Sequence, residues 1–225
     1  MLTDITWLGT LLPPLPLLLA FMGASLVLAI TPGPAVIYIL ARTLSQGRRS
    51  GLASVAGVAI GNFGNAVGAA LGLAAVLAVS NAAFTLIKLA GAAYLIWLGL
   101  KMWRAPEAAA DMAALPSVAS SPLRQVFRDG FVVALLNPKT ALFFAAFLPQ
   151  FMTPGLATPI GQSVTLGAVF VLIASGTDSL YVLLAGLLAP RLQQARGAAR
   201  WGRRAAGSAF IGLGLLTAFS ARPGR

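Results

Sequence analysis

The run Leu28-Ala29-Ile30-Thr31-Pro32-Gly33-Pro34 decides the fold, because it places two prolines and a glycine inside an apolar stretch that covers residues 15–41. A proline lacks a backbone N–H group and blocks the carbonyl group four residues before it. A helix over this stretch is therefore expected to break at the prolines. If the stretch crosses a membrane, the backbone groups freed by the break need a partner or a cavity, because lipid offers them none.

The composition of the whole chain places this stretch in a membrane. Hydrophobic residues make up 58% of the 225 positions and charged residues 9%, whereas an average soluble domain carries roughly 25% charged residues. A bilayer core of about 30 Å requires roughly 20 apolar residues per helix. We therefore expect an all-α membrane protein with six transmembrane helices, at residues 15–41, 51–79, 82–103, 130–152, 160–189 and 205–221.

The basic residues predict the orientation of these helices. Twelve of them flank the loops after the first, third and fifth predicted spans, whereas the second and fourth loops contain none. Arg222 and Arg225 follow the last span, and Lys88 and Lys139 lie within spans. The positive-inside rule places the twelve in the cytoplasm and both termini outside. The formal charge of +11 therefore indicates contact with anionic lipid headgroups rather than with nucleic acid.

A second proline break, Asn137-Pro138-Lys139 in the fourth predicted span, suggests an internal repeat. Residues 105–122, rich in Ala, Ser and Pro, are predicted to link residues 15–104 to residues 123–221 within one transporter domain of residues 1–225. Each part holds three spans, so the second must enter the membrane inverted. Broken spans at matching positions of two inverted repeats are typical of the binding site of a secondary transporter.

Two charged residues lie deep in the predicted spans: Lys139, near the midplane of the fourth, and Asp178, the single carboxylate inside any span. A charge at that depth costs on the order of 2.5–3.5 kcal/mol on insertion scales, so both should face protein or water. Lys139 is predicted to hold a substrate carboxylate, or else to neutralise Asp178 in a structural ion pair. Asp178 is predicted to couple transport to protons, because the spans contain no other acid and an ionised carboxylate is costly away from water.

The predicted substrate site combines the two breaks with two asparagines of the second span, at Thr31, Pro32, Gly33, Pro34, Asn137, Pro138, Lys139, Asn62 and Asn65. The alternative is that the breaks are structural kinks and that the asparagines bond across helices. The second span also carries glycines every three or four residues, which predicts close helix packing along one face. These glycines are Gly57, Gly61, Gly64, Gly68 and Gly72.

The residue types that are missing exclude several classes of function. The chain has no Cys and no His, so it offers no thiol relay, zinc site or haem ligand. We expect no cofactor, no metal centre and no enzymatic activity. A passive channel that uses the same broken helices is the main alternative to an active exporter. A metal-ion exporter is a further alternative, although one buried carboxylate is a poor site for a cation that prefers several oxygen ligands.

The same residues resemble those of the LysE/RhtB family of amino-acid exporters, in particular its homoserine/threonine branch. The similar stretches begin at Leu28, Gly47, Lys88 and Asn137 and follow one another along nearly the whole chain. They are Leu28-Ala29-Ile30-Thr31-Pro32-Gly33-Pro34, Gly47-Arg48-Arg49-Ser50-Gly51, Lys88-Leu89-Ala90-Gly91-Ala92-Ala93-Tyr94-Leu95-Ile96-Trp97-Leu98-Gly99, and Asn137-Pro138-Lys139 through Phe147-Leu148-Pro149-Gln150-Phe151.

The resemblance implies a multi-pass exporter of small amino acids in a bacterial inner membrane, driven by the proton gradient. It also implies that the two breaks and Asp178 form the site. The expected partners are an amino-acid substrate, protons and the lipid bilayer. The motifs do not separate the substrate branches of the family, and the sequence leaves homo-oligomerisation open.

Overall fold

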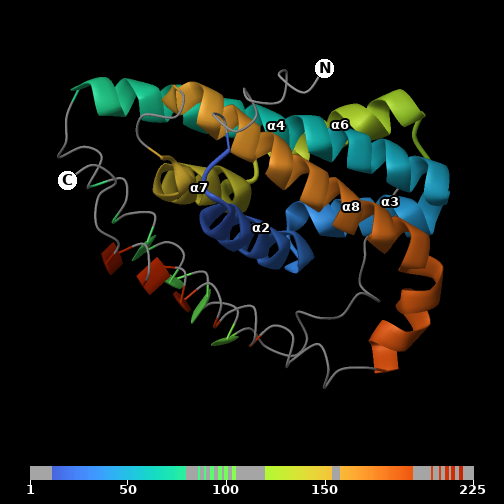
Figure 1. Ribbon diagram of the computed structural model, residues 1–225. Coiled ribbons are helices and arrows are strands. Elements are labelled where there is room, and N and C mark those ends of the chain that lie inside the picture. Colours follow the sequence, from blue (N-terminus) through green and yellow to red (C-terminus); the bar gives the residue numbers. More distant parts are fainter. Residues whose placement is uncertain are drawn as a thin grey trace, which may run out of the picture.

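The computed structural model of the chain describes residues 12–79, 120–153 and 158–194, together with single positions between 86 and 104 and between 204 and 219. All regular elements in this part are helices (Figure 1). The predicted linker at 105–122 lies almost wholly outside the described residues. In the predicted spans at 82–103 and 205–221, the structure describes only scattered positions. The described helices belong to the other four predicted spans.

The described helices hold two candidate membrane spans, or four if each bent pair counts as one. The helices are α2 (Leu15–Ile30), α3 (Pro34–Gln46), α4 (Arg48–Val79), α6 (Leu123–Leu135), α7 (Pro138–Phe147), the 3-10 turn η3 (Leu148–Phe151) and α8 (Pro159–Gln194). The long helices α4 and α8 are each apolar enough to cross a membrane alone. The α2–α3 pair and the pair formed by α6 with α7 and η3 each qualify as one bent span.

Proline chemistry explains both bends. Helix α2 ends at Ile30, Pro34 is the first residue of α3, and the axes of the two helices differ by 51°. The second bend, of 47°, separates α6 from α7. Here Asn137 caps α7, because its side-chain oxygen accepts a hydrogen bond of 3.1 Å from the backbone N–H of Lys139. Both predicted breaks are therefore confirmed.

Helix α4 runs along one side of the bundle and packs against α3, α6, α7 and α8 (Figure 1). Its glycines allow a close approach to α6. A Cβ atom at Gly57 would overlap the carbonyl oxygen of Phe127, and one at Gly61 would crowd the backbone of α6 one turn further on. Gly64 meets Leu135 of the same helix, whereas nothing lies within 4 Å of a Cβ at Gly68 or Gly72. The predicted packing role is thus confirmed for three of the five glycines.

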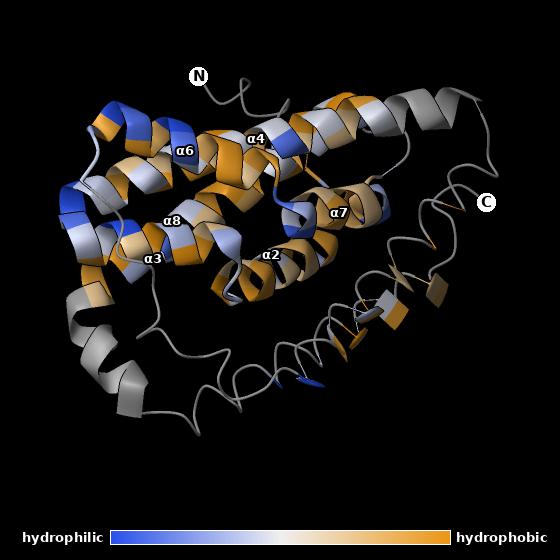
Figure 2. Ribbon diagram, turned by 180° about the vertical axis from the view of Figure 1, so that it is seen from behind, coloured by the Kyte–Doolittle hydropathy of each residue, from blue (hydrophilic) through white to orange (hydrophobic). Residues whose placement is uncertain are grey.

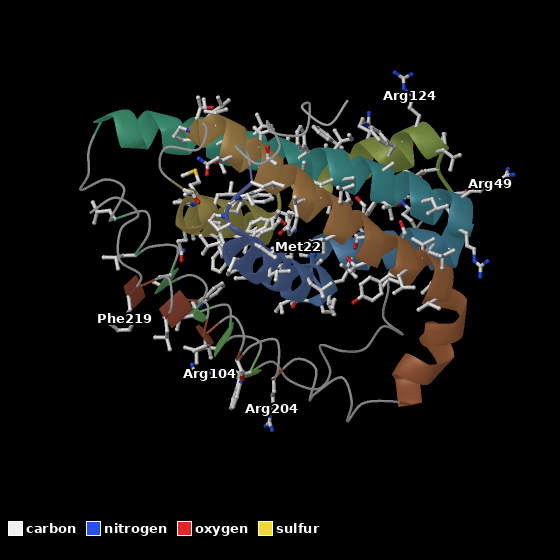
Figure 3. All side chains as sticks on the ribbon, in the orientation of Figure 1. Met22, Arg49, Arg104, Arg124, Arg204 and Phe219 are labelled. Atoms are coloured by element: carbon white, nitrogen blue, oxygen red, sulfur yellow. The ribbon has the colours of Figure 1, made fainter. Side chains whose placement is uncertain are left out.

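Hydrophilic and apolar residues occupy separate parts of the bundle surface, as expected for a membrane protein. Hydrophilic residues gather where α3 ends and where α4 and α6 begin (Figure 2). Arg49 and Arg124 extend outward from this end (Figure 3). Large apolar side chains such as Leu15 and Leu172 are 66% and 74% exposed along the helices. The first and third basic loops therefore share one end of the molecule, as the charge pattern predicts.

Single described positions show that the third and sixth predicted spans touch. The indole N–H of Trp103 donates to the carbonyl oxygen of Arg204 and to the hydroxyl of Ser208, at 3.0 and 3.2 Å. At Gly214, a Cβ atom would lie 2.8 Å from the carbonyl oxygen of Ala92. An early position in one span thus meets a late position in the other, so the two segments run antiparallel where they are described.

Candidate functional site

The two breaks meet through Lys139, the second residue of α7. Its ammonium group donates to the backbone carbonyl oxygens of Leu28 and Thr31, at 3.0 and 2.7 Å. Pro32 cannot donate to the Leu28 carbonyl in the way that a helical residue would. The ammonium of Lys139 therefore takes the place of the missing N–H group, and it connects the two broken spans.

The other two carbonyls freed by the prolines of the two breaks are also satisfied by donors of the protein. Pro34 leaves the carbonyl of Ile30 without its helical donor, and the hydroxyl of Tyr181 on α8 donates to it at 2.8 Å. Pro138 likewise frees the carbonyl of Ala134. This oxygen accepts from the side-chain amide of Asn65 at 2.8 Å and from the backbone N–H of Asn137 at 3.0 Å. In this structure the protein's own donors are therefore the partners that the freed carbonyls need.

A cavity of about 30 Å³ lies beside these breaks. Since a water molecule needs roughly 10–15 Å³ of such space, the cavity has room for about two waters and not for an amino acid. Helices α2, α3, α4, α7 and α8 all contribute to its wall. The lining residues are Leu28, Ala29, Gly33, Ala35, Val36, Asn62, Asn137, Lys139, Thr140, Phe170, Ala174 and Asp178.

Opposite charges share this cavity without touching. Asp178 is 5% exposed and lies on α8. Among the described residues, no ion pair within 4.0 Å joins its carboxylate to Lys139, and no hydrogen-bond donor reaches it. The amide oxygen of Asn62 is also buried without a hydrogen-bond partner in this region. The cavity therefore offers one cation and two unoccupied oxygen acceptors.

The predicted site residues fall into two groups. Gly33, Asn62, Asn137, Lys139 and Asp178 line the cavity. Thr31 does not line it, but its carbonyl oxygen accepts from the ammonium group of Lys139, which does. The structure does not place the other four in the wall; they are Pro32, Pro34, Pro138 and Asn65. Their contribution here is to create the breaks or, for Asn65, to satisfy a carbonyl freed by one.

Close approach explains the glycine between the two prolines of the first break. Gly33 has an extended backbone that any residue can adopt, with φ −148° and ψ −176°. A Cβ atom at this position would, however, lie 3.3 Å from the Lys139 ammonium nitrogen. A side chain at position 33 would therefore press on the lysine that joins the two breaks.

The predicted site omits Tyr181, Thr140, Phe170 and Ala174 of this region, together with four apolar lining residues of the first broken span, Leu28, Ala29, Ala35 and Val36. The first four contribute polar groups or lie on the same helix as Asp178. The signal for three of them is helical spacing from Asp178, because residues three or four apart share a face. Tyr181 lies three positions after Asp178, and Ala174 and Phe170 lie four and eight positions before it. Thr140 follows Lys139 directly and has no comparable signal.

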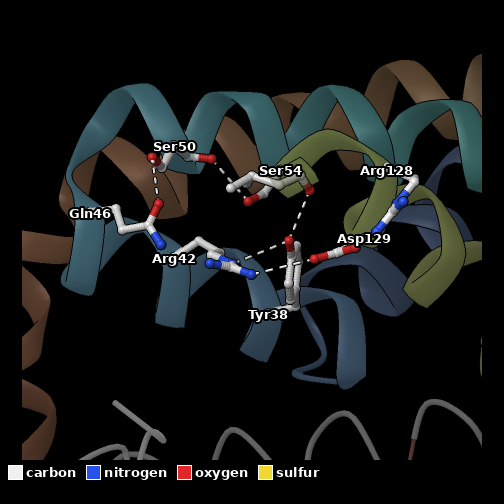
Figure 4. A network of polar contacts seen from close by, with 8 residues as sticks. Tyr38, Arg42, Gln46, Ser50, Ser54, Arg128 and Asp129 are labelled. Atoms are coloured by element: carbon white, nitrogen blue, oxygen red, sulfur yellow. Dashed lines mark hydrogen bonds and ion pairs between the residues drawn. The ribbon is translucent and has the colours of Figure 1, made fainter. Parts of the chain in front are cut away.

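A second polar cluster lies toward the basic end of the bundle (Figure 4). Arg42, which the charge pattern assigns to a loop, is only 5% exposed within α3. Its guanidinium lies 3.5 Å from a carboxylate oxygen of Asp129 on α6 and donates to the Tyr38 hydroxyl at 3.3 Å. Tyr38 in turn donates to the carbonyl oxygen of Val126 at 2.8 Å. The cluster joins the first broken span to the second.

The described residues contain no group of three or more His, Cys, Asp or Glu side chains placed to hold a metal ion. The charged groups that face the cavity are Lys139 and Asp178 alone among its lining residues. This arrangement suits a molecule that carries both charges more than a bare cation.

Comparison with protein families gives one matching description. The sequence model of the LysE type translocators matches residues 26–220. An uncharacterised membrane protein of Vibrio cholerae is 34% identical over 203 residues, which cover 89% of this chain and 95% of that protein. No solved structure matches the chain.

Two relatives have names that state a function. The homoserine/homoserine lactone efflux protein of Salmonella typhimurium is 33% identical over 204 residues, covering 88% of this chain and 94% of that protein. The leucine efflux protein of Klebsiella pneumoniae is 26% identical over 196 residues, covering 87% and 91%.

Proposed function

This chain belongs to the LysE type translocator family, and from that premise we propose that it exports small amino acids or their derivatives in exchange for protons. Members of the family are transporters, so the chain is a membrane transporter and not an enzyme. Relatives named for homoserine and for leucine efflux support an amino-acid substrate, and they differ in which one.

One observation carries this proposal: Lys139 and Asp178 line the same cavity without an ion pair between them. A free amino acid carries a carboxylate and an ammonium group on adjacent atoms. Burying either charge alone is costly, whereas burying both against fixed opposite charges offsets that cost. A zwitterion is therefore the ligand that best neutralises this cavity.

The contacts of Lys139 indicate how the substrate carboxylate binds. The ammonium group already holds the carbonyl oxygens of Leu28 and Thr31. A carboxylate is a stronger acceptor than a backbone carbonyl, so it displaces one or both of them. Substrate binding then loosens the link between the two breaks, which permits the cavity to open.

At the other side of the cavity, the substrate ammonium group binds the carboxylate of Asp178 and the amide oxygen of Asn62. Neither oxygen group has a hydrogen-bond partner within the described part of the chain. A proton and an ammonium group cannot both neutralise one carboxylate. When Asp178 takes a proton from the outside, it releases the substrate; when it loses that proton inside, it accepts the next substrate. This competition is the proposed basis of exchange.

The proposal extends to the whole arrangement. The chain forms two inverted repeats of three spans, with both termini outside a bacterial inner membrane. The shared pattern of a broken span followed by an unbroken one, α2–α3 then α4 and α6–α7 then α8, supports this symmetry. The present cavity is too small for an amino acid, so it corresponds to a closed state between the inward-open and outward-open forms.

The test uses purified full-length protein in liposomes loaded with single amino acids. A proton gradient that is acidic outside should drive efflux of small amino acids against their concentration gradient, and a protonophore should abolish uphill movement. A passive channel would carry the same substrates only downhill and would ignore the protonophore. Failure to carry any amino acid, with or without a gradient, would refute the proposed substrate class.

A further inference from the structure

We infer that Ala174 and Phe170 set the size of the amino-acid side chain that this transporter accepts, by forming the far wall of the cavity beyond Asp178. The inference rests on the proposed function, because it takes Asp178 as the site of the substrate ammonium group. Neither residue belongs to the charged machinery of the breaks.

Three residues of α8 line the cavity from one face of the helix. Phe170, Ala174 and Asp178 are four residues apart and all line the cavity. With a rise of about 1.5 Å per residue, each step along this face covers about 6 Å. An ammonium group at Asp178 therefore places the side chain of a small amino acid beside Ala174, with Phe170 one further step away.

The wall that Phe170 forms is rigid. Phe170 is 2% exposed, and its ring packs against Phe144 and Phe143 with centroids 4.9 and 5.8 Å apart. These rings belong to a core cluster that also includes Phe147 and Phe21. A close-packed aromatic cluster resists displacement because filled interiors lack free volume. Phe170 thus gives the cavity a rigid aromatic wall, whereas Ala174 contributes only a methyl group to the same face.

The wall opposite is also apolar, since Leu28 and Val36 line the cavity from the first broken span. The side chain of a small amino acid packs against Ala174 and ends before it reaches the Phe170 ring. The bulkier side chain of leucine, with two methyl groups on Cγ, would collide with the ring. The geometry therefore favours serine, threonine, homoserine or alanine over leucine and phenylalanine.

The experiment measures exchange of labelled alanine, homoserine and leucine by full-length protein in liposomes. Wild-type protein should exchange alanine and homoserine faster than leucine. Phe170→Ala should raise the leucine-to-homoserine ratio about tenfold or more, the usual effect of changing the fit of a hydrophobic pocket by a methylene group or more. Ala174→Val should lower the homoserine-to-alanine ratio by a similar factor. Leu172→Ala is the matched control, because Leu172 lies on the same helix and is 74% exposed.

Three results would overturn the inference while leaving the proposed function intact. These are wild-type exchange of leucine as fast as homoserine, equal rate changes for all three amino acids in both variants, or the same shift in Leu172→Ala. If Phe170→Ala does not yield folded protein, the ratio measured for Ala174→Val decides alone. Wild-type protein that exchanges none of the three would instead refute the proposed function.

Discussion

At the scale of single residues, Lys139 shows what a sequence can and cannot predict. Its depth in a span marks it as a residue of a protein-lined site, because a lone cation in lipid is costly. Its two actual acceptors are backbone carbonyls more than 100 positions earlier in the chain. A sequence pattern carries side-chain types but not the backbone groups that a distant break exposes. Of the two predicted roles of Lys139, the structural ion pair with Asp178 is not formed among the described residues, and the two groups line one cavity instead.

The role of Asp178 yields a prediction at the same scale. Asp178→Asn keeps the size and hydrogen-bonding capacity of the side chain but cannot exchange a proton. Proton-driven uphill efflux should fall to background, while exchange of substrate down its gradient should persist at a reduced rate. Measuring both proton-driven efflux and substrate exchange with the reconstituted variant distinguishes loss of coupling from loss of transport. Ser179→Ala, at the next position of the same helix, is the control and should retain both activities.

A purely structural Asp178 would give a different pattern. The asparagine variant would then lower the yield or thermal stability of the protein, and the surviving protein would still couple efflux to the proton gradient. Wild-type uphill efflux by Asp178→Asn would exclude the proton-carrying role.

At the scale of helices, the positions of the two breaks could be predicted from the sequence, whereas the side chains that donate to the freed carbonyls could not. Proline acts on its own helix, so Pro32, Pro34 and Pro138 mark the breaks from sequence alone. The side chains that satisfy the freed carbonyls come from other helices, and only tertiary packing brings them there. The burial of Arg42 was missed for the same reason. A basic residue near a span end is usually assigned to the loop, and the sequence gives no sign that Asp129 of α6 will face it.

Restoring the first broken helix should stop transport. Replacing both Pro32 and Pro34 with Ala supplies backbone donors to the carbonyls of Leu28 and Ile30, so the α2–α3 bend of 51° loses its cause. Lys139 and Tyr181 then lose their acceptors. We expect the variant to insert and purify normally but to show exchange at least tenfold below wild type. Pro16→Ala, in the first turn of α2, is the control. Undiminished exchange by the double variant would show that the break is only a kink.

The ion pair between α3 and α6 predicts a stability effect. Asp129→Asn leaves the guanidinium of Arg42 buried without its carboxylate, and losing one partner of a buried pair costs about 3–5 kcal/mol. Because the Asp129 side chain is 30% exposed and the pair is 3.5 Å apart, we expect a smaller loss of about 1–3 kcal/mol. The thermal midpoint of detergent-solubilised protein reports it.

The neighbouring Arg128 provides the comparison for this prediction. It also lies near Asp129, at 3.6 Å, but its side chain is 72% exposed, so Arg128→Gln should change stability by less than about 1 kcal/mol. The double variant Arg42→Gln with Asp129→Asn should be more stable than Asp129→Asn alone, since it buries no unpaired charge. Equal effects of the Arg128 and Asp129 substitutions would contradict the assignment of Arg42 as the main partner.

At the scale of the whole molecule, hydrophobic length and charge asymmetry predicted the membrane class and the four spans that the structure describes. Hydrophobic length and charge asymmetry are totals over many residues, so they do not depend on any single tertiary contact. The inverted symmetry and the absolute orientation depend on relations between distant segments and on the membrane itself. They remain predictions of the charge pattern.

The orientation can be tested with single cysteines, because the chain has none of its own. Arg222→Cys should react with an impermeant thiol reagent in intact cells, because the last span is predicted to end outside. Met112→Cys, in the predicted cytoplasmic linker, should react only after the membrane is permeabilised. Labelling of position 112 but not of position 222 in intact cells would reverse the topology.

The capped carbonyls have a consequence for the genetics of this protein. A proline and the side chain that replaces its missing N–H form one unit, as Pro34 does with Tyr181 through the carbonyl oxygen of Ile30. Loss of the tyrosine hydroxyl alone leaves that oxygen orphaned in an apolar setting. Loss of the proline as well returns a backbone donor to it. A second mutation at the proline therefore acts as a suppressor of folding defects at the tyrosine, although it cannot restore transport that depends on the break. Selection for yield and selection for export would thus recover different revertants from the same parent.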